Sequence, residues 1–135
     1  MRAVSPTGID VEYETFGDPA DPAVLLVMGF GAQLLGWDAD FCRQLAARGR
    51  YVIRYDNRDC GLSTRIDDRP VDLGDLIAAL TSGDVEGAVA MAPYSLLDMA
   101  RDGVGVLDAL GIDRAHVVGS SMGGMIAQKM ATEFP

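Results

Sequence analysis

The sequence is 135 residues long, 49% hydrophobic and 23% charged, with a formal net charge of −9 at pH 7. Length and composition fit one globular domain at most, and an acidic balance without any Lys/Arg cluster argues against nucleic acid or an anionic membrane surface as a partner. The longest apolar run, residues 23–28, is too short to span a bilayer, and the first residues lack the apolar core of a secretory signal. We therefore expect a cytoplasmic protein.

The hydrophobic patterns predict a hairpin and then strands that alternate with helices. In chain order, we expect strands at residues 2–5, 9–16 and 23–28, a helix at 38–48, a strand at 51–55, a helix at 95–110, a strand at 115–119 and a last helix from 122. Residues 9–16 alternate apolar and polar side chains, whereas residues 23–28 are apolar throughout, as in a strand covered on both faces. This order predicts an α/β fold: a mostly parallel sheet with helices on both faces.

Residues 67–93 interrupt this alternation. One short stretch has apolar residues at helical spacing, namely Leu73, Leu76, Ile77 and Leu80, and a run rich in Gly, Ala and Val follows it. We interpret the segment as an excursion from the core, and we favour a surface insertion over a wall of a substrate pocket.

The pentapeptide Gly119-Ser120-Ser121-Met122-Gly123 follows the last predicted strand and opens the last predicted helix. It has the G-x-S-x-G form of a nucleophile elbow, in which a serine sits on a sharp strand-to-helix turn. A serine is a good nucleophile only when a base takes its proton and fixed donors receive the developing charge. Ser121 is therefore the candidate nucleophile. Gly119 and Gly123 give the turn room, and the backbone N–H of Met122 is a candidate oxyanion donor. The alternative is a Gly- and Ser-rich turn without chemistry.

Two further segments, together with the elbow, resemble the α/β-hydrolase family over essentially the whole chain. Residues 25–31, Leu-Leu-Val-Met-Gly-Phe-Gly, match the family's oxyanion loop after the third strand, and this match makes the backbone N–H of Phe30 the second oxyanion donor. Residues 54–63 are similar to the family's D-x-R-G-x-G-x-S segment, with Asp59 in place of the usual glycine. Three polar residues of that segment are interpreted as structural rather than catalytic: Asp56, Arg58 and Ser63.

Within the family, the resemblance is to the branch that holds aclacinomycin methylesterase and related bacterial lipases and esterases. It implies that Ser121 attacks a carboxylic ester of a small molecule and that water then hydrolyses the acyl-enzyme. It implies neither a metal nor a cofactor. Cys42 and Cys60 have no metal-site spacing and no neighbouring histidine, so we expect them to be free thiols.

The family's catalytic triad has the order serine, acid, histidine, and only 14 residues follow Ser121 here. The single histidine, His116, precedes Ser121 along a strand by a length of about 16 Å. A base must lie within about 3 Å, so we expect His116 to be a strand residue outside the triad. We therefore interpret residues 1–135 as the N-terminal half of a hydrolase domain, without the acid and the histidine and nearly inactive alone. The strand at 115–119 then becomes an exposed apolar edge, which predicts self-association.

Two other function classes remain as alternatives. A truncated hydrolase scaffold can act as a non-catalytic interaction module whose bare strand edge pairs with a partner chain. A dinucleotide-binding domain is suggested by Gly29-Phe30-Gly31 after a strand and by Asp56 at the end of another. Against the latter, Leu34 occupies the third glycine position, and Asp56 falls 27 residues after Gly29 instead of about 20.

Overall fold

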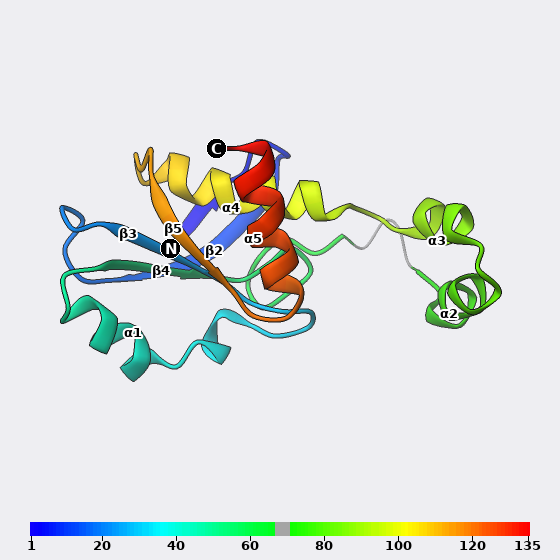
Figure 1. Ribbon diagram of the computed structural model, residues 1–135, viewed down its shortest axis with the longest axis horizontal. Coiled ribbons are helices and arrows are strands. Elements are labelled where there is room, and N and C mark those ends of the chain that lie inside the picture. The colour runs from blue at the N-terminus through cyan, green and yellow to red at the C-terminus, as the bar shows by residue number, and fades with distance from the viewer. Residues whose placement is uncertain (67–70) are drawn as a thin grey trace. The chain divides into compact units, whose positions relative to one another are not determined.

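A five-stranded sheet with helices on both faces forms the larger of two structural units (Figure 1). The computed structural model describes residues 1–66 and 71–135, and its units are Met1–Arg65 with Leu96–Pro135, and Ile66–Ser95. The larger unit contains, in chain order, β1 (Arg2–Val4), β2 (Asp10–Phe16), β3 (Ala23–Val27), the 3₁₀ helix η1 (Leu34–Gly36), α1 (Ala39–Ala46), β4 (Tyr51–Tyr55), α4 (Leu96–Ala109), β5 (Ala115–Gly119) and α5 (Met122–Glu133). The smaller unit contains α2 (Leu73–Ser82) and α3 (Val85–Met91).

The sheet is mixed and mostly parallel, in the order β1-β2-β4-β3-β5. β3 is parallel to both of its neighbours, with Leu25 opposite Ile53 of β4 and opposite Val117 of β5. β2 is antiparallel to β4 and to β1, so four of the five strands point the same way. The predicted hairpin is present, with Ala3 paired to Val11. These findings confirm the predicted fold class.

β3 and β4 form the centre of the core, because every residue of both strands is buried. Alternation along β3 directs Val24 and Leu26 to one face and Leu25 and Val27 to the other, and all four side chains are apolar. Burial of each such side chain contributes about 1.5–3 kcal/mol to folding. The continuous apolar run therefore places β3 in the centre of the core. The loop at its carboxyl end begins from this buried strand.

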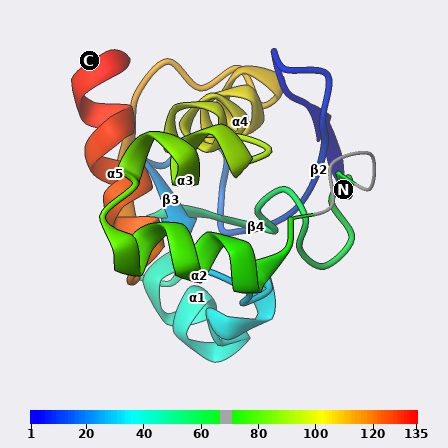
Figure 2. The same ribbon diagram turned by 90° about the vertical axis from the view of Figure 1, so that its right-hand side faces the viewer.

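α1 covers one face of the sheet, and α4 and α5 cover the other, as Figures 1 and 2 show from two directions. The Asp38 carboxylate caps α1 by accepting hydrogen bonds from two N–H groups of its first turn. Cys42 of α1 is fully buried against the sheet. On the opposite face, α5 buries Ile126 and Met130, which are spaced by four residues as the predicted helix requires.

The smaller unit consists of two short helices, each capped by an aspartate. The carboxylate of Asp72 accepts hydrogen bonds from two N–H groups at the start of α2, and that of Asp84 accepts one from the N–H of Gly87 at the start of α3. α2 contains the predicted amphipathic stretch. α3 was not expected from its Gly-, Ala- and Val-rich sequence, and it forms because an aspartate cap precedes residues that include strongly helix-favouring alanines. The predicted insertion, 67–93, begins with residues outside the described ranges, and its boundaries stay a prediction.

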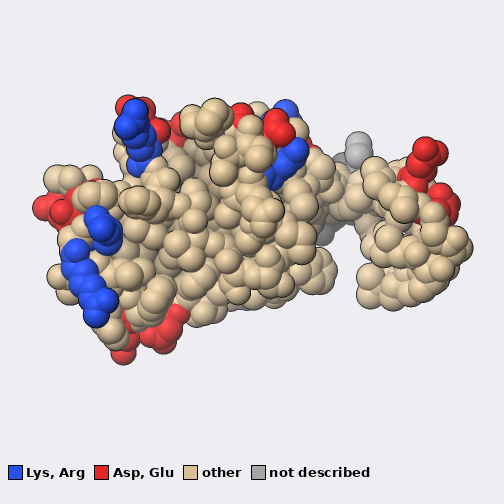
Figure 3. Space-filling view, viewed as in Figure 1, with Lys and Arg blue, Asp and Glu red and all other residues tan. Residues whose placement is uncertain are grey.

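The surface carries charges of both signs. On the face of the larger unit shown in Figure 3, basic and acidic side chains are interspersed. The same view shows only acidic charges over α2 and α3, and residues 71–95 contain no Lys or Arg. In the part of the chain that the structure describes, no helix has the length and hydrophobicity that crossing a bilayer requires.

A buried ion pair joins the loop after β4 to α4. Arg58 Nε and Nη2 donate to the two carboxylate oxygens of Asp102 at 2.7 and 2.9 Å, and both side chains are almost inaccessible. Thr7 Oγ1 accepts from Arg58 Nη2 and donates to Asp102, each at 3.0 Å. The network fastens the hairpin turn, the loop and the helix together, which is the structural role interpreted for Arg58 from the sequence.

Candidate active site

Ser121 sits on the turn between β5 and α5 in a backbone conformation that L residues rarely adopt. Its φ and ψ angles are +54° and −123°. Among residues 1–66 and 71–135, Asp59 is the other non-glycine residue with a positive φ. The conformation of Ser121 costs about 1–3 kcal/mol and persists only where the surrounding structure enforces it. Ser121 is an exposed residue on this strained turn, at the carboxyl end of β5.

Two glycines allow the backbone segments of the elbow to approach closely. A Cβ on Gly119 would overlap the carbonyl group of Gly123, and a Cβ on Gly123 would overlap the carbonyl oxygen of Val27 at the end of β3. A side chain at either position therefore has to displace backbone. Gly124 is different, because a Cβ there would meet nothing closer than 3.6 Å.

Gly123→Ala is expected to lower the free energy of unfolding by about 3 kcal/mol or more, because the new methyl group collides with backbone of β3. Gly124→Ala is the matched control in the next position of α5. It is expected to be neutral or to stabilise by up to about 1 kcal/mol, since alanine favours the helix and space exists for it. Urea unfolding followed by circular dichroism measures both, and equal effects of the two substitutions would contradict this account of the elbow.

The loop that follows β3 lies directly against Ser121. A Cβ on Gly29 would lie 3.1 Å from the Cβ of Ser121 and 3.7 Å from its Oγ. The N–H of Ser120 donates to the carbonyl oxygen of Val27 at 3.0 Å, which ties the elbow to the end of β3. Phe30, the next residue of the loop, has an 83% exposed side chain. The structure thus brings together the predicted nucleophile and the predicted oxyanion loop. The roles of the Phe30 and Met122 N–H groups stay predictions.

Two neighbouring buried residues after β4 hold the two ends of that loop. Asn57 Nδ2 donates to the carbonyl oxygen of Met28 at 2.9 Å, and Asp56 Oδ1 accepts from the N–H of Leu34 at 2.6 Å. The other oxygen of Asp56 accepts from the N–H of Leu62 at 2.9 Å. Asp56 is therefore a loop-organising residue in this structure. Sequence reasoning did not single out Asn57, although it lies in the same motif segment.

Asp59 stands where the family pattern has a glycine, and it keeps a backbone conformation that glycine adopts easily. Its φ is +61°, in the left-handed region that aspartate tolerates better than most residues. Its N–H donates to the carbonyl oxygen of Thr64 at 2.9 Å, which closes the turn. Asp59 therefore departs from the family pattern but can still adopt the backbone conformation of this turn.

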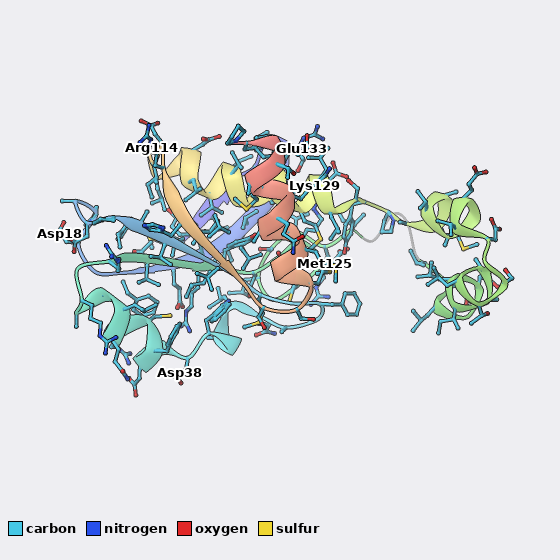
Figure 4. All side chains as sticks on the ribbon, in the orientation of Figure 1. Asp18, Asp38, Arg114, Met125, Lys129 and Glu133 are labelled. Carbon is cyan, nitrogen blue, oxygen red and sulfur yellow. The ribbon has the colours of Figure 1, made fainter. Side chains whose placement is uncertain are left out.

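The structure does not bring His116 to Ser121. His116 lies at the start of β5, opposite Val24, with Ser121 beyond the other end of the strand. Figure 4 shows the same separation, with Arg114 just before β5 and Met125 in the first turns of α5 at opposite ends of the strand. Glu133, near the end of α5, accepts a hydrogen bond from Lys129 at 2.7 Å.

The two cysteines do not compete with Ser121 as nucleophiles. Cys42 and Cys60 are buried and free, and burial raises the pKa of both thiols, so both stay protonated near neutral pH. Within residues 1–66 and 71–135, no group of three or more His, Cys, Asp and Glu residues is arranged to hold a metal ion. Of Ser121, Cys42 and Cys60, Ser121 is therefore the exposed candidate for the nucleophile.

The antiparallel β2 beside β4 argues against the dinucleotide-binding alternative. A dinucleotide fold carries its glycine-rich loop after the first strand of a parallel sheet in the order 3-2-1-4-5-6. Here the Gly29-Phe30-Gly31 loop follows the third strand, and the strand order and the antiparallel β2 differ from that plan. Asp56 also bonds two backbone N–H groups of its own chain.

Comparison with known proteins gives matches over nearly the whole chain. The family model described as the alpha/beta hydrolase fold matches residues 22–135. Rhodomycin D methylesterase DauP of Streptomyces sp. (strain C5) is 35% identical to this chain over 134 residues, which are 99% of this chain and 38% of that protein.

Solved structures give the same result. A hydrolase from Pseudomonas aeruginosa PA01 matches with a TM-score of 0.75 and 28% identity, over 100% of this chain and 41% of that one. The enol-lactonase from Burkholderia xenovorans LB400 matches with a TM-score of 0.74 and 25% identity, over 99% of this chain and 42% of that one. This chain therefore spans 38–42% of the length of these proteins. These structural matches and the matched family model confirm the resemblance drawn from the sequence. The chain belongs to the alpha/beta hydrolase fold family.

Proposed function

We propose that the protein is a serine hydrolase of carboxylic esters, with Ser121 as its nucleophile. The observation that carries this proposal is the strained turn at Ser121, φ +54°, with Gly29 of the loop after β3 packed against the same side chain. Strain of this kind is costly and clusters at functional sites. The name of the Streptomyces relative, a methylesterase, supports an ester as the substrate class.

In the proposed reaction, Ser121 Oγ attacks the carbonyl carbon of the ester while a histidine takes its proton. The carbonyl oxygen becomes an oxyanion, to which the N–H groups of Phe30 and Met122 donate hydrogen bonds. The tetrahedral intermediate collapses and expels the alcohol, which receives the proton from the histidine, and an acyl-Ser121 remains. Water then attacks the acyl group by the same route, which releases the acid and restores the Ser121 hydroxyl.

We propose that residues 1–135 form the N-terminal part of a hydrolase domain, with the segment 67–93 as an insertion. The chain spans 38% of the rhodomycin relative, and His116 lies at the wrong end of β5 to serve Ser121. The catalytic acid and histidine are then supplied by sequence that follows the elbow helix, as the family's triad order requires. We use the term completed protein for residues 1–135 extended by the rest of the hydrolase domain. That extension is either the chain's own continuation or the corresponding region of rhodomycin D methylesterase DauP.

Apolar side chains at the same edge of the sheet as Ser121 favour an ester with an apolar group, as in esterases and lipases. Phe30, Leu35 and Leu62 lie on the loops after β3 and β4, and their side chains are 83%, 64% and 66% exposed. Apolar side chains on loops at the carboxyl ends of strands are suited to bind the apolar part of a small molecule. We propose a small-molecule ester as the substrate, cytoplasmic action, and chemistry that needs no metal or cofactor.

Hydrolysis of p-nitrophenyl esters by the completed protein tests this function. We expect release of p-nitrophenol from short acyl chains and release of methanol from methyl esters of apolar acids. A folded completed protein that hydrolyses neither set, at any acyl length, would contradict the proposal.

A second candidate function rests on the free edge of β5. Among the described strands, β5 pairs with β3 alone, and Val118 is 44% exposed. A groove between α4, β5 and α5 is lined in part by Leu107, Met130 and Phe134. An open strand edge can pair with a strand of another chain without any use of Ser121. Co-elution of residues 1–135 with the separately produced remainder of the domain tests pairing at this edge, and Val118→Lys is expected to abolish it while Ser121→Ala is not. A pair that forms but hydrolyses no ester would favour the interaction function, whereas an active pair would favour the hydrolase.

A further inference from the structure

Asn57 is buried at the carboxyl end of β4 and reaches across to the loop after β3. Its Nδ2 donates to the carbonyl oxygen of Met28 at 2.9 Å, and the residue is 4% exposed. A carbonyl oxygen only accepts hydrogen bonds, so the amide must present its NH₂ group to Met28. The hydrogen bond joins residues 29 positions apart in the sequence and thereby couples two neighbouring loops at the edge of the sheet.

The other end of this amide has no partner among the described residues: Asn57 Oδ1 is buried and accepts no hydrogen bond. A buried acceptor without a donor destabilises a protein, and a leucine of similar size would avoid that cost. The benefit of asparagine at this position therefore comes from its NH₂ group.

The Met28 carbonyl sets the orientation of the first peptide unit of the loop. Because that unit is planar and trans, fixing the carbonyl oxygen also fixes the direction of the Gly29 N–H. The next peptide unit carries the N–H of Phe30 and joins Gly29 to Phe30. The orientation of this unit depends on the ψ of Gly29 and the φ of Phe30, and the glycine offers little resistance to rotation on its side. The anchors at the ends of the loop therefore restrict the orientations that the Phe30 N–H can take.

Inside the loop, a long backbone hydrogen bond also restrains this peptide unit. The backbone hydrogen bond from Ala32 to the carbonyl oxygen of Gly29 is long, at 3.4 Å. The far end is held by Asp56, which accepts from the N–H of Leu34 at 2.6 Å. Asn57 holds the near end, where Gly29 packs against Ser121.

We propose that Asn57 is a positioning residue of the oxyanion site: its amide holds the Met28 carbonyl so that the following peptide unit keeps the Phe30 N–H directed at the substrate oxygen. This inference rests on the proposed function, because it needs Ser121 as the nucleophile. Asn57 touches no reacting atom. It acts where charge develops in the transition state, and therefore affects kcat rather than substrate binding.

Asn57→Leu and Asn57→Asp in the completed protein test the inference, because both remove the donor at nearly constant size. We expect kcat to fall about 10- to 100-fold while KM stays within about twofold. The affinity of a trifluoromethyl ketone, which forms a tetrahedral adduct with the nucleophile, is expected to fall by the same factor as kcat. Asn57→Ser, which leaves space for water, provides the same measurements if neither of the larger replacements folds.

Ser63→Ala is the matched control. Ser63 is 5% exposed in the same loop, its Oγ donates to the carbonyl oxygen of Asp56 at 2.7 Å and accepts from the N–H of Glu12 at 2.9 Å, and none of its hydrogen bonds reaches the loop after β3. The control is expected to lose stability and to keep kcat and inhibitor affinity. Native kcat and inhibitor affinity in the Asn57 variants, or an equal loss in Ser63→Ala, would overturn the inference. Retained activity in Ser121→Ala would instead overturn the proposed function.

Discussion

Ester hydrolysis by the completed protein is lost when Ser121 is replaced with alanine. The expected decrease in kcat is about 10⁴- to 10⁶-fold, because the atom that forms the acyl intermediate is gone while the oxyanion donors and the substrate contacts remain. Hydrolysis of p-nitrophenyl acetate at saturating concentration measures this decrease directly. Retention of a tenth or more of the activity would show that Ser121 is not the nucleophile.

Ser121→Gly is the matched control for that substitution. It removes the same hydroxyl group and also the strain of a side chain at φ +54°. We expect the glycine variant to be as inactive as the alanine variant but more stable by about 1 kcal/mol or more. If urea unfolding shows the two variants to be equally stable, the turn at Ser121 is not strained in solution.

The polypeptide of residues 1–135, produced alone, is expected to hydrolyse esters at least about 10⁴-fold more slowly than the completed protein. Without an acid and a histidine, only binding and oxyanion stabilisation remain, and in triad enzymes these give about 10³–10⁴-fold over water against millions-fold more for the intact site. His116 cannot substitute, because it lies at the opposite end of β5 from Ser121. Parallel assays of the two proteins with the same p-nitrophenyl ester measure the ratio.

The same polypeptide is expected to self-associate, because one edge of β5 has no partner among the described strands. Size-exclusion chromatography with light scattering should show dimers or larger species. Val118→Lys places a charge on the exposed side of this strand and is expected to shift the distribution toward monomer. A monodisperse monomer that turns over esters at ordinary enzymatic rates would contradict both predictions for residues 1–135: low activity without the acid and the histidine, and self-association through β5.

The parts of the fold that the sequence predicts are those that depend on local chemistry. β3 is predicted because an uninterrupted apolar run suits a strand covered on both faces, and Ala23–Val27 is buried throughout. The elbow is predicted because G-x-S-x-G places glycines where backbone segments touch, and the overlaps at Gly119 and Gly123 arise in just those positions. In each case the residues that carry the signal are neighbours in the chain.

The parts that the sequence does not predict depend on contacts between distant segments or on weak local preferences. The hydrogen bond from Asn57 to Met28 crosses between two loops, where no periodicity marks which side chains meet. η1 and α3 are short and have little pattern of their own, and α3 depends on the Asp84 cap. The strain at Ser121 is visible only in backbone angles, because its sequence pattern alone also fits an ordinary turn.

A covalent adduct with a fluorophosphonate tests the central claim most directly, because such reagents react with serines activated within a triad. The completed protein is inactivated with the reagent and digested, and the modified peptide is identified by mass spectrometry. We predict one phosphonyl group per chain, attached to Ser121, with activity lost in proportion to its incorporation. An inactivated protein in which Ser121 is unmodified would contradict the assignment of the nucleophile.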